Sequence, residues 1–261
     1  MALDEVRVKV DRAKDHLNAF KAELDGFVSR QPYPLHVVTK DERSAKVRDV
    51  EWTTDIPWLW SAIAGDCVHN LRSTLDHIVF ALSGGPGNAP DDSEFPIFLN
   101  SDRYFKRDRK CEPARGSGLW KIRGVVADGA YTEFHRLQPF FGSNPTRHPL
   151  WIIHELDRLD KHRALHILRG VAYGYASLVD RGIGDASELP LGWRQASATS
   201  SHLYRTQMVG MKVKMKVRHD LAVHVSLEPQ TVGSHEYLDV LLEKLITFVE
   251  EEVIATFAPF L

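Results

Sequence analysis

The chain has 261 residues, a formal net charge of −2 and two cysteines. A nearly neutral chain has no overall field that would draw it to nucleic acid or to a membrane, so any such binding must come from local patches. Two cysteines without a CxxC motif exclude a disulfide scaffold and a thiolate metal site, and they favour a reducing compartment. The charged start MALDEVRVKV is not typical of a signal peptide, and no apolar run approaches the ~20 residues that span a bilayer. We therefore expect a soluble, cytoplasmic protein.

The first third of the chain predicts two long helices separated by a β-hairpin. Residues 2–30 carry apolar side chains at alternating steps of three and four, which is typical of an amphipathic helix. This helix could pack in a bundle or form a dimeric coiled coil, and the sequence leaves both open. Residues 33–54 alternate Val, Thr and Trp with charged residues, which predicts the hairpin. Asp55 and Pro57 then mark the start of a helix over 56–82, which SGGPGN ends.

The rest of the chain predicts two more long helices and a sheet. Residues 84–146 form an irregular insertion that is basic in part, and helices are expected over about 149–168 and 235–256. Three strands within about 201–228 predict an antiparallel meander. The predicted fold class is therefore α+β: a four-long-helix bundle core with an inserted β-hairpin and a C-terminal antiparallel β-meander laid against it, all in a single domain.

The predicted second helix carries many ionisable side chains within GDCVHNLRSTLDHIVFAL. At 100° per residue, His69, Arg72 and Asp76 share one face, and Arg72 and Asp76 form an i,i+4 pair. A second polar group lies on one flank of the apolar stripe and consists of Asp66, Asn70 and His77.

The third long helix adds two charges that the periodicity points towards the core. Asp160 and Arg163 fall in the centre of its apolar stripe, where an unpaired charge costs several kcal/mol. The two can pair with each other, and Arg163 then has donors left for the second helix. We therefore expect a buried polar network between these helices, with Asp66 and Asn70 as further members. The network either fixes the helix register or forms a catalytic or ligand site, and the sequence leaves both open.

Histidine beside arginine suits metal-free cleavage of RNA, because His titrates near neutrality and Arg stabilises a charged phosphorane. The ribose 2′-OH supplies the nucleophile. The segment Arg72-Ser-Thr-Leu-Asp-His77 resembles the Arg–x4–6–His motif of HEPN domains, although Ser73 stands where that family usually has Asn, His or Asp. The segments GDCVHNLRSTLDH and HPLWIIHELDRLDKHR also resemble a group of bacterial proteins to which no activity is assigned.

The HEPN resemblance implies a helical bundle that is commonly a dimer and is in many cases a metal-independent endoribonuclease. In such domains the Arg and His of both protomers meet in one cleft. Carried over to this chain, Arg72 would stabilise the phosphorane and His77 would be the general acid or base. Asp76 or His69 would orient these two groups.

Two basic segments are candidate RNA-binding surfaces. The strand MKVKMKVR places four cations on one face, ~6.6–6.8 Å apart: Lys212, Lys214, Lys216 and Arg218. The loop 101–123 has eight Arg or Lys against three Asp or Glu, with Arg107, Arg109 and Lys110 at its centre. Tyr104, Phe105 and Trp120 are interleaved as rings on which bases can stack. Lysines also protect sheet edges, so a purely structural role for the strand stays open.

Three functions follow from the sequence. The first is a HEPN-like, RNA-directed protein, with cleavage that needs no metal and no cofactor. The second is a non-enzymatic dimeric binding or assembly module. The third is a metal-dependent enzyme in which His162 and His166, at i,i+4 spacing, hold an ion with groups from the second helix. The expected partners are RNA and a second copy of the chain, and no membrane is expected.

Overall fold

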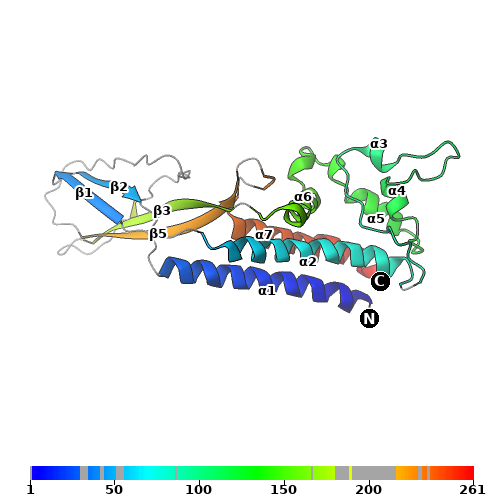
Figure 1. Ribbon diagram of the computed structural model, residues 1–261, viewed down its shortest axis with the longest axis horizontal. Coiled ribbons are helices and arrows are strands. Elements are labelled where there is room, and N and C mark those ends of the chain that lie inside the picture. Colours follow the sequence, from blue (N-terminus) through cyan, green and yellow to red (C-terminus); the bar gives the residue numbers. More distant parts are fainter. Residues whose placement is uncertain are drawn as a thin grey trace.

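Long helices form the body of the molecule (Figure 1). The computed structural model describes residues 2–29, 35–41, 44–50, 56–85, 87–165, 167–179, 188–189, 216–228, 231–233 and 236–261. The body contains α1 (Ala2–Ser29), α2 (Trp58–Leu82), α6 (Pro149–His162) and α7 (Leu238–Thr247). After α7 the helix continues as a π-helical segment (Phe248–Ile254), then α8 (Ala255–Phe257) and a 3-10 turn (Ala258–Phe260). Within the described residues, no helix is both long enough and apolar enough to cross a membrane.

The apolar stripe of α1 forms the centre of the core. Its buried members are Val6, Val10, Ala13, Leu17, Phe20, Leu24 and Phe27. They pack against α2 and α7, and Phe20 and Phe27 contact the Trp60 ring edge-on at centroid distances of 5.9 and 5.0 Å. Burial raises the pKa of Cys67 in α2 to about 12, so this thiol is unreactive at neutral pH.

Ion pairs at the edge of the stripe fix α1 in the bundle. Lys14 pairs with Glu250 at 2.6 Å, and Lys21 pairs with Glu243 at 3.0 Å. Because the apolar stripe is buried within the chain, α1 is a bundle helix here and has no second apolar seam for a coiled coil.

A lobe of short helices and turns, residues 99–147, covers one end of the helical body (Figure 1) and shares its core through Phe134, whose ring lies 4.4 Å from that of Phe257. It contains α3 (Ser101–Tyr104), α4 (Gly118–Lys121), α5 (Ala130–Arg136) and 3-10 turns at Pro139–Phe141 and Pro145–Arg147. Two of the short helices have side-chain caps: Asn100 accepts hydrogen bonds from two backbone N–H groups of α3, and Ser117 accepts one from Trp120 in α4.

The strands lie past the opposite end of the helices (Figure 1). β1 (Leu35–Asp41) and β2 (Ser44–Val50) pair antiparallel. β3 (Ile167–Val179) pairs antiparallel with both β4 (Glu188–Leu189) and β5 (Lys216–Leu227), in the order β4-β3-β5. At the base of this ribbon, Val225 and Leu227 are buried in the core.

The predicted α+β fold class is wrong. The structure is mostly helical, and its strands extend away from the helices instead of forming a sheet laid against them. The C-terminal meander is contradicted because its last two predicted strands, MKVKMKVR and LAVHVSLE, require a turn at His219 and Asp220, whereas β5 runs unbroken through these residues and pairs with β3. That turn contains no Gly or Pro, so nothing in the backbone prevents the strand from continuing. Residues 201–215 of the predicted meander lie outside the described residues.

The helix predicted over 149–168 ends at His162. Arg163 has extended backbone angles, with φ −163° and ψ 150°, and Ser61 Oγ donates a hydrogen bond to the carbonyl of Leu165 at 2.6 Å. Ile167 then begins β3. Apolar residues after position 162 therefore belong to a strand, although their spacing also suits a helix.

Candidate functional site

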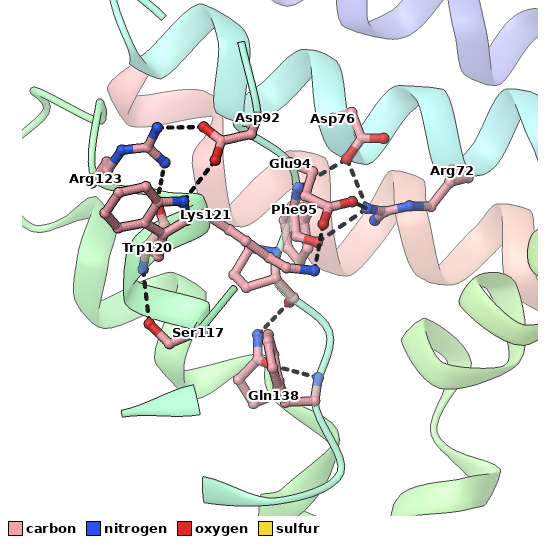
Figure 2. Close-up of polar contacts among 12 residues, drawn as sticks. Arg72, Asp76, Asp92, Glu94, Phe95, Ser117, Trp120, Lys121, Arg123 and Gln138 are labelled. Carbon is pink, nitrogen blue, oxygen red and sulfur yellow. Dashed lines mark hydrogen bonds and ion pairs between the residues drawn. The ribbon is translucent and has the colours of Figure 1, made fainter. Parts of the chain in front are cut away.

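Arg72 lies inside the molecule, between α2 and the segment that follows it (Figure 2). Its side chain is 6% exposed, and Nη2 lies 2.9 Å from Oδ1 of Asp76. The same nitrogen donates to Oε2 of Glu94 at 3.3 Å and to the carbonyl of Phe95 at 3.2 Å. The N–H of Phe95 donates to Asp76 at 2.8 Å, and Lys121 pairs with the other oxygen of Glu94. Arg72 is thus held by two carboxylates and a carbonyl of its own chain.

The charges of this cluster set the pKa values of its acids. Burial raises the pKa of Asp76, and the charge of Arg72 offsets only part of that effect. Burial also acts to raise the pKa of Glu94, but the hydrogen bond and charge of Lys121, with the charge of Arg72, outweigh it and lower the pKa. Glu94 is therefore ionised at neutral pH, and the positive charge of Arg72 is neutralised within the fold.

His77 does not face this cluster. Five residues along a helix turn the side-chain direction by about 140°, and His77 is exposed. It borders a surface hollow of about 370 Å³ together with Glu5, Val6 and Phe80. The structure therefore does not bring Arg72 and His77 together within one chain. The cleft that the HEPN resemblance implies is shared by two protomers, and it stays a prediction.

A second polar cluster joins α2 to α6. Nδ1 of His69 lies 3.0 Å from Oδ1 of Asp157, and Nζ of Lys161 lies 2.6 Å from Oδ2. The side chain of Asp157 is 6% exposed and that of His69 is 55% exposed, so a buried carboxylate orients a ring that reaches solvent. Asn70 turns back on its own helix and donates to the carbonyl of Asp66 at 2.8 Å. The connection between the helices thus runs through Asp157, which the sequence did not single out.

Asp160 and Arg163 do not form the predicted pair. Arg163 follows the last residue of α6, is exposed, and makes no side-chain hydrogen bond or ion pair with another described residue. Asp160 instead lies against Gly65, where an added Cβ would be 2.2 Å from Oδ1. Burial and the carboxylates of Asp66 and Asp157 raise the pKa of Asp160. The prediction failed because it continued the helix past the point where the backbone becomes extended.

Two histidines, His148 just before α6 and His154 within it, are kept neutral at pH 7 by their surroundings. Nδ1 of His148 accepts a hydrogen bond from the N–H of Leu150 at 3.2 Å and so caps the helix, which requires an unprotonated nitrogen. Burial lowers the pKa of His148. Burial, followed by the charge of Arg72, lowers the pKa of His154. His154 therefore belongs to the surroundings of the Arg72 cluster, and the sequence analysis missed it.

We expect the free energy of unfolding to fall as the pH is lowered from about 7.5 to about 5.5. Both histidines have a lower pKa in the folded chain than in the unfolded chain. At a pH between the folded and the unfolded pKa of these histidines, the unfolded chain binds more protons than the folded chain, so lowering the pH favours unfolding. Urea denaturation at a series of pH values measures the effect. His148→Asn retains a cap acceptor without titrating and should flatten the profile. An unchanged profile in both His148→Asn and His154→Gln would contradict these assignments.

The metal-site alternative finds no support in the described part of the chain. Those residues contain no group of three or more His, Cys, Asp or Glu side chains arranged to hold an ion. His162 is exposed at the end of α6, and His166 lies outside the described residues.

The predicted basic strand is described only in part. Lys212 and Lys214 lie outside the described residues. Lys216 and Arg218 belong to β5, where they are register partners of Val179 and Ser177 in β3. β5 is an edge strand of the described sheet, which is a position where lysines also protect against aggregation.

The basic segment between α3 and α4 forms a tight hairpin. Arg107 bridges to Pro113, and the N–H of Asp108 donates to the carbonyl of Glu112 at 2.8 Å. Six cations of residues 101–123 are exposed, and none of them forms an ion pair with another described residue: Arg103, Lys106, Arg107, Arg109, Lys110 and Arg115.

The other two cations of residues 101–123 are neutralised. Lys121 pairs with Glu94, and Arg123 pairs with Asp92 (Figure 2). The guanidinium carbon of Arg123 also lies 3.9 Å from the centroid of the Trp120 ring, whose N–H donates to Asp92 at 2.6 Å. Arg123 therefore covers one face of Trp120, and the hydrogen bond to Asp92 connects α4 to the segment that follows α2.

Four rings meet at the surface of the 99–147 lobe, and we call them the ring cluster: Phe105, His135, Phe140 and Phe141. The His135 centroid lies 4.7 Å from those of both Phe105 and Phe141, and Phe140 lies 4.8 Å from Phe141. Phe105 is 42% exposed and Phe141 is 59% exposed. Of these four rings, only Phe105 was predicted from the sequence as a ring on which bases can stack. Two adjacent Phe between Pro139 and Gly142 could have indicated the rest, because such a turn leaves apolar side chains at the surface.

Comparison with known proteins assigns no family to this arrangement. No protein-family model matches the chain, and searches of curated proteins and of solved structures give no match. The function is therefore inferred from the described residues themselves.

Proposed function

We propose that the protein binds RNA through the 99–147 lobe. The observation that carries the proposal is that the exposed ring of Phe105 directly precedes a basic hairpin whose cations form no ion pair with a described residue. The exposed Phe141 belongs to the same ring cluster through its contact with His135. Proteins that bind single strands combine cations for the phosphates with aromatic faces for the bases. Residues 101–115 carry six Arg or Lys and three Asp or Glu, a local charge of +3, whereas the whole chain has −2. The local patch thus supplies the field that the whole chain lacks.

The proposed function is binding without a cleavage step at Arg72 and His77. Arg72 is neutralised by its own carboxylates, and His77 lies on another side of α2. A phosphorane needs a fixed, available cation, and a general acid or base within hydrogen-bond reach of the same phosphate. The geometry of one chain does not provide this combination.

We expect a fluorescently labelled single-stranded RNA to bind the full chain with an affinity that falls as salt rises. Fluorescence anisotropy at about 50 and 200 mM salt gives the slope of the logarithm of the binding constant against the logarithm of the salt concentration. Each phosphate contact on a single strand contributes about −0.7 to this slope. Changing Lys106, Arg109 and Lys110 to Gln should weaken binding and flatten the slope by up to about 2. Those three side chains are exposed and form no ion pair with a described residue, so stability should not change.

The matched control removes three cations elsewhere that likewise form no ion pair with a described residue: Arg7→Gln, Lys9→Gln and Arg163→Gln. An equal loss of affinity in this control would show that the binding is not local and would contradict the proposal. Absence of binding at low salt, binding to DNA alone, or displacement of RNA by equimolar polyglutamate would also contradict it. The last result would indicate an acidic protein as the partner.

A further inference from the structure

The ring cluster leaves ring surface available to a ligand. Phe105 meets His135 at an interplanar angle of 74°, and His135 meets Phe141 at 65°. In an edge-to-face contact, each ring covers at most one face of its neighbour. The exposure of Phe105 and Phe141 locates the uncovered surface on these two rings, each of which contacts His135.

The rings are held by a rigid base. Tyr104 is fully buried and contacts Phe105, Phe140 and Phe98 at centroid distances of 4.8, 5.7 and 5.8 Å. Gln138 is also buried, and its side chain donates to the carbonyl of Pro96 at 2.7 Å (Figure 2). It also donates to the carbonyl of Phe134 at 2.9 Å. Rings whose positions are already fixed lose little conformational entropy when a ligand binds.

We infer that Phe105 and Phe141 each stack one unpaired base, so that the ligand is a single strand or an unpaired loop. This inference rests on the proposed function and narrows its ligand class. Trp120 adds no third platform of the same kind, because Arg123 occupies one of its faces. The bases of a duplex are stacked on each other and are not free for protein rings, whereas its phosphates remain available to the basic hairpin. Phosphate binding and base binding are therefore separable in this lobe.

The test compares three labelled ligands of equal length: a single-stranded RNA, the same backbone without bases, and a duplex. We expect the base-bearing strand to bind most tightly. Phe105→Ala and Phe141→Ala should each weaken its binding by about 5- to 100-fold and leave the abasic backbone unaffected. Val126→Ala removes an exposed apolar side chain outside the ring cluster and should change neither affinity. Phe141→Trp keeps an aromatic face and should retain affinity even if Phe105→Ala is poorly folded.

The outcomes separate the two levels of the proposal. Equal affinity for the abasic and base-bearing strands would overturn base stacking while leaving phosphate-driven binding intact. A duplex that binds as tightly as the single strand would overturn the ligand class in the same way. Absence of binding to all three ligands would instead overturn the proposed function.

Discussion

Replacing Arg72 with methionine is expected to lower the free energy of unfolding by about 2–4 kcal/mol. The change keeps apolar volume but leaves Asp76, Glu94 and the Phe95 carbonyl without their shared donor. Removing one partner of a fully buried pair costs about 3–5 kcal/mol. We expect somewhat less because the side chains of Asp76 and Glu94 are 37% and 42% exposed and gain hydration when the cation is lost. Urea denaturation measures the change.

His77→Ala is the control for Arg72→Met and should alter the free energy of unfolding by no more than about 0.5 kcal/mol, because His77 is exposed. Asp76→Asn supplies a second comparison: in its background Arg72→Met should cost less, since one interaction is already lost. A stable Arg72→Met protein would contradict a structural role for the cluster. If that protein, like His77→Ala, also lost an RNA-cleaving activity, the endoribonuclease hypothesis would be restored.

The periodicity of the sequence was sufficient to place the long helices. Apolar side chains at steps of three and four in α1 and α2 are the ones that the structure buries, from Val6 to Phe27 and from Trp60 to Leu82. Burial along a helix depends mainly on local spacing, so it can be predicted without knowledge of the partners. The i,i+4 pair of Arg72 and Asp76 could be predicted from the sequence for the same reason.

Partners from distant parts of the chain could not be predicted. Nothing near Arg72 in the sequence indicates that Glu94 and Phe95 fold back onto it, and this contact changes an available cation into a neutralised one. The pairing of β3 with β5 is equally long-range, and apolar residues after His162 suit either a helix or a strand. The ring cluster likewise depends on tertiary structure, because it gathers side chains from three separate segments.

Gly118→Ala is expected to destabilise the 99–147 lobe and to weaken RNA binding together. A Cβ at this position would lie 2.2 Å from Cδ2 of Tyr104, whose ring is fully buried beneath Phe105. Because Tyr104 has no space into which to move, the lobe must shift, at a cost of about 1–3 kcal/mol. Displacing Tyr104 also displaces Phe105, so the affinity for base-bearing RNA should fall while that for the abasic backbone should change less. Urea denaturation and fluorescence anisotropy on the same preparation measure both effects.

The matched control for Gly118→Ala is Gly142→Ala in the same lobe. Gly142 has φ −75°, and a Cβ there would lie 3.4 Å from the carbonyl oxygen of Pro139, which is an ordinary contact. Its stability should therefore stay within about 1 kcal/mol of the wild type. If Gly118→Ala is as stable as this control, Tyr104 does not pack as the structure has it. If Gly118→Ala is less stable but binds base-bearing RNA with full affinity, the binding of bases does not depend on the position of Phe105, the ring that Tyr104 supports.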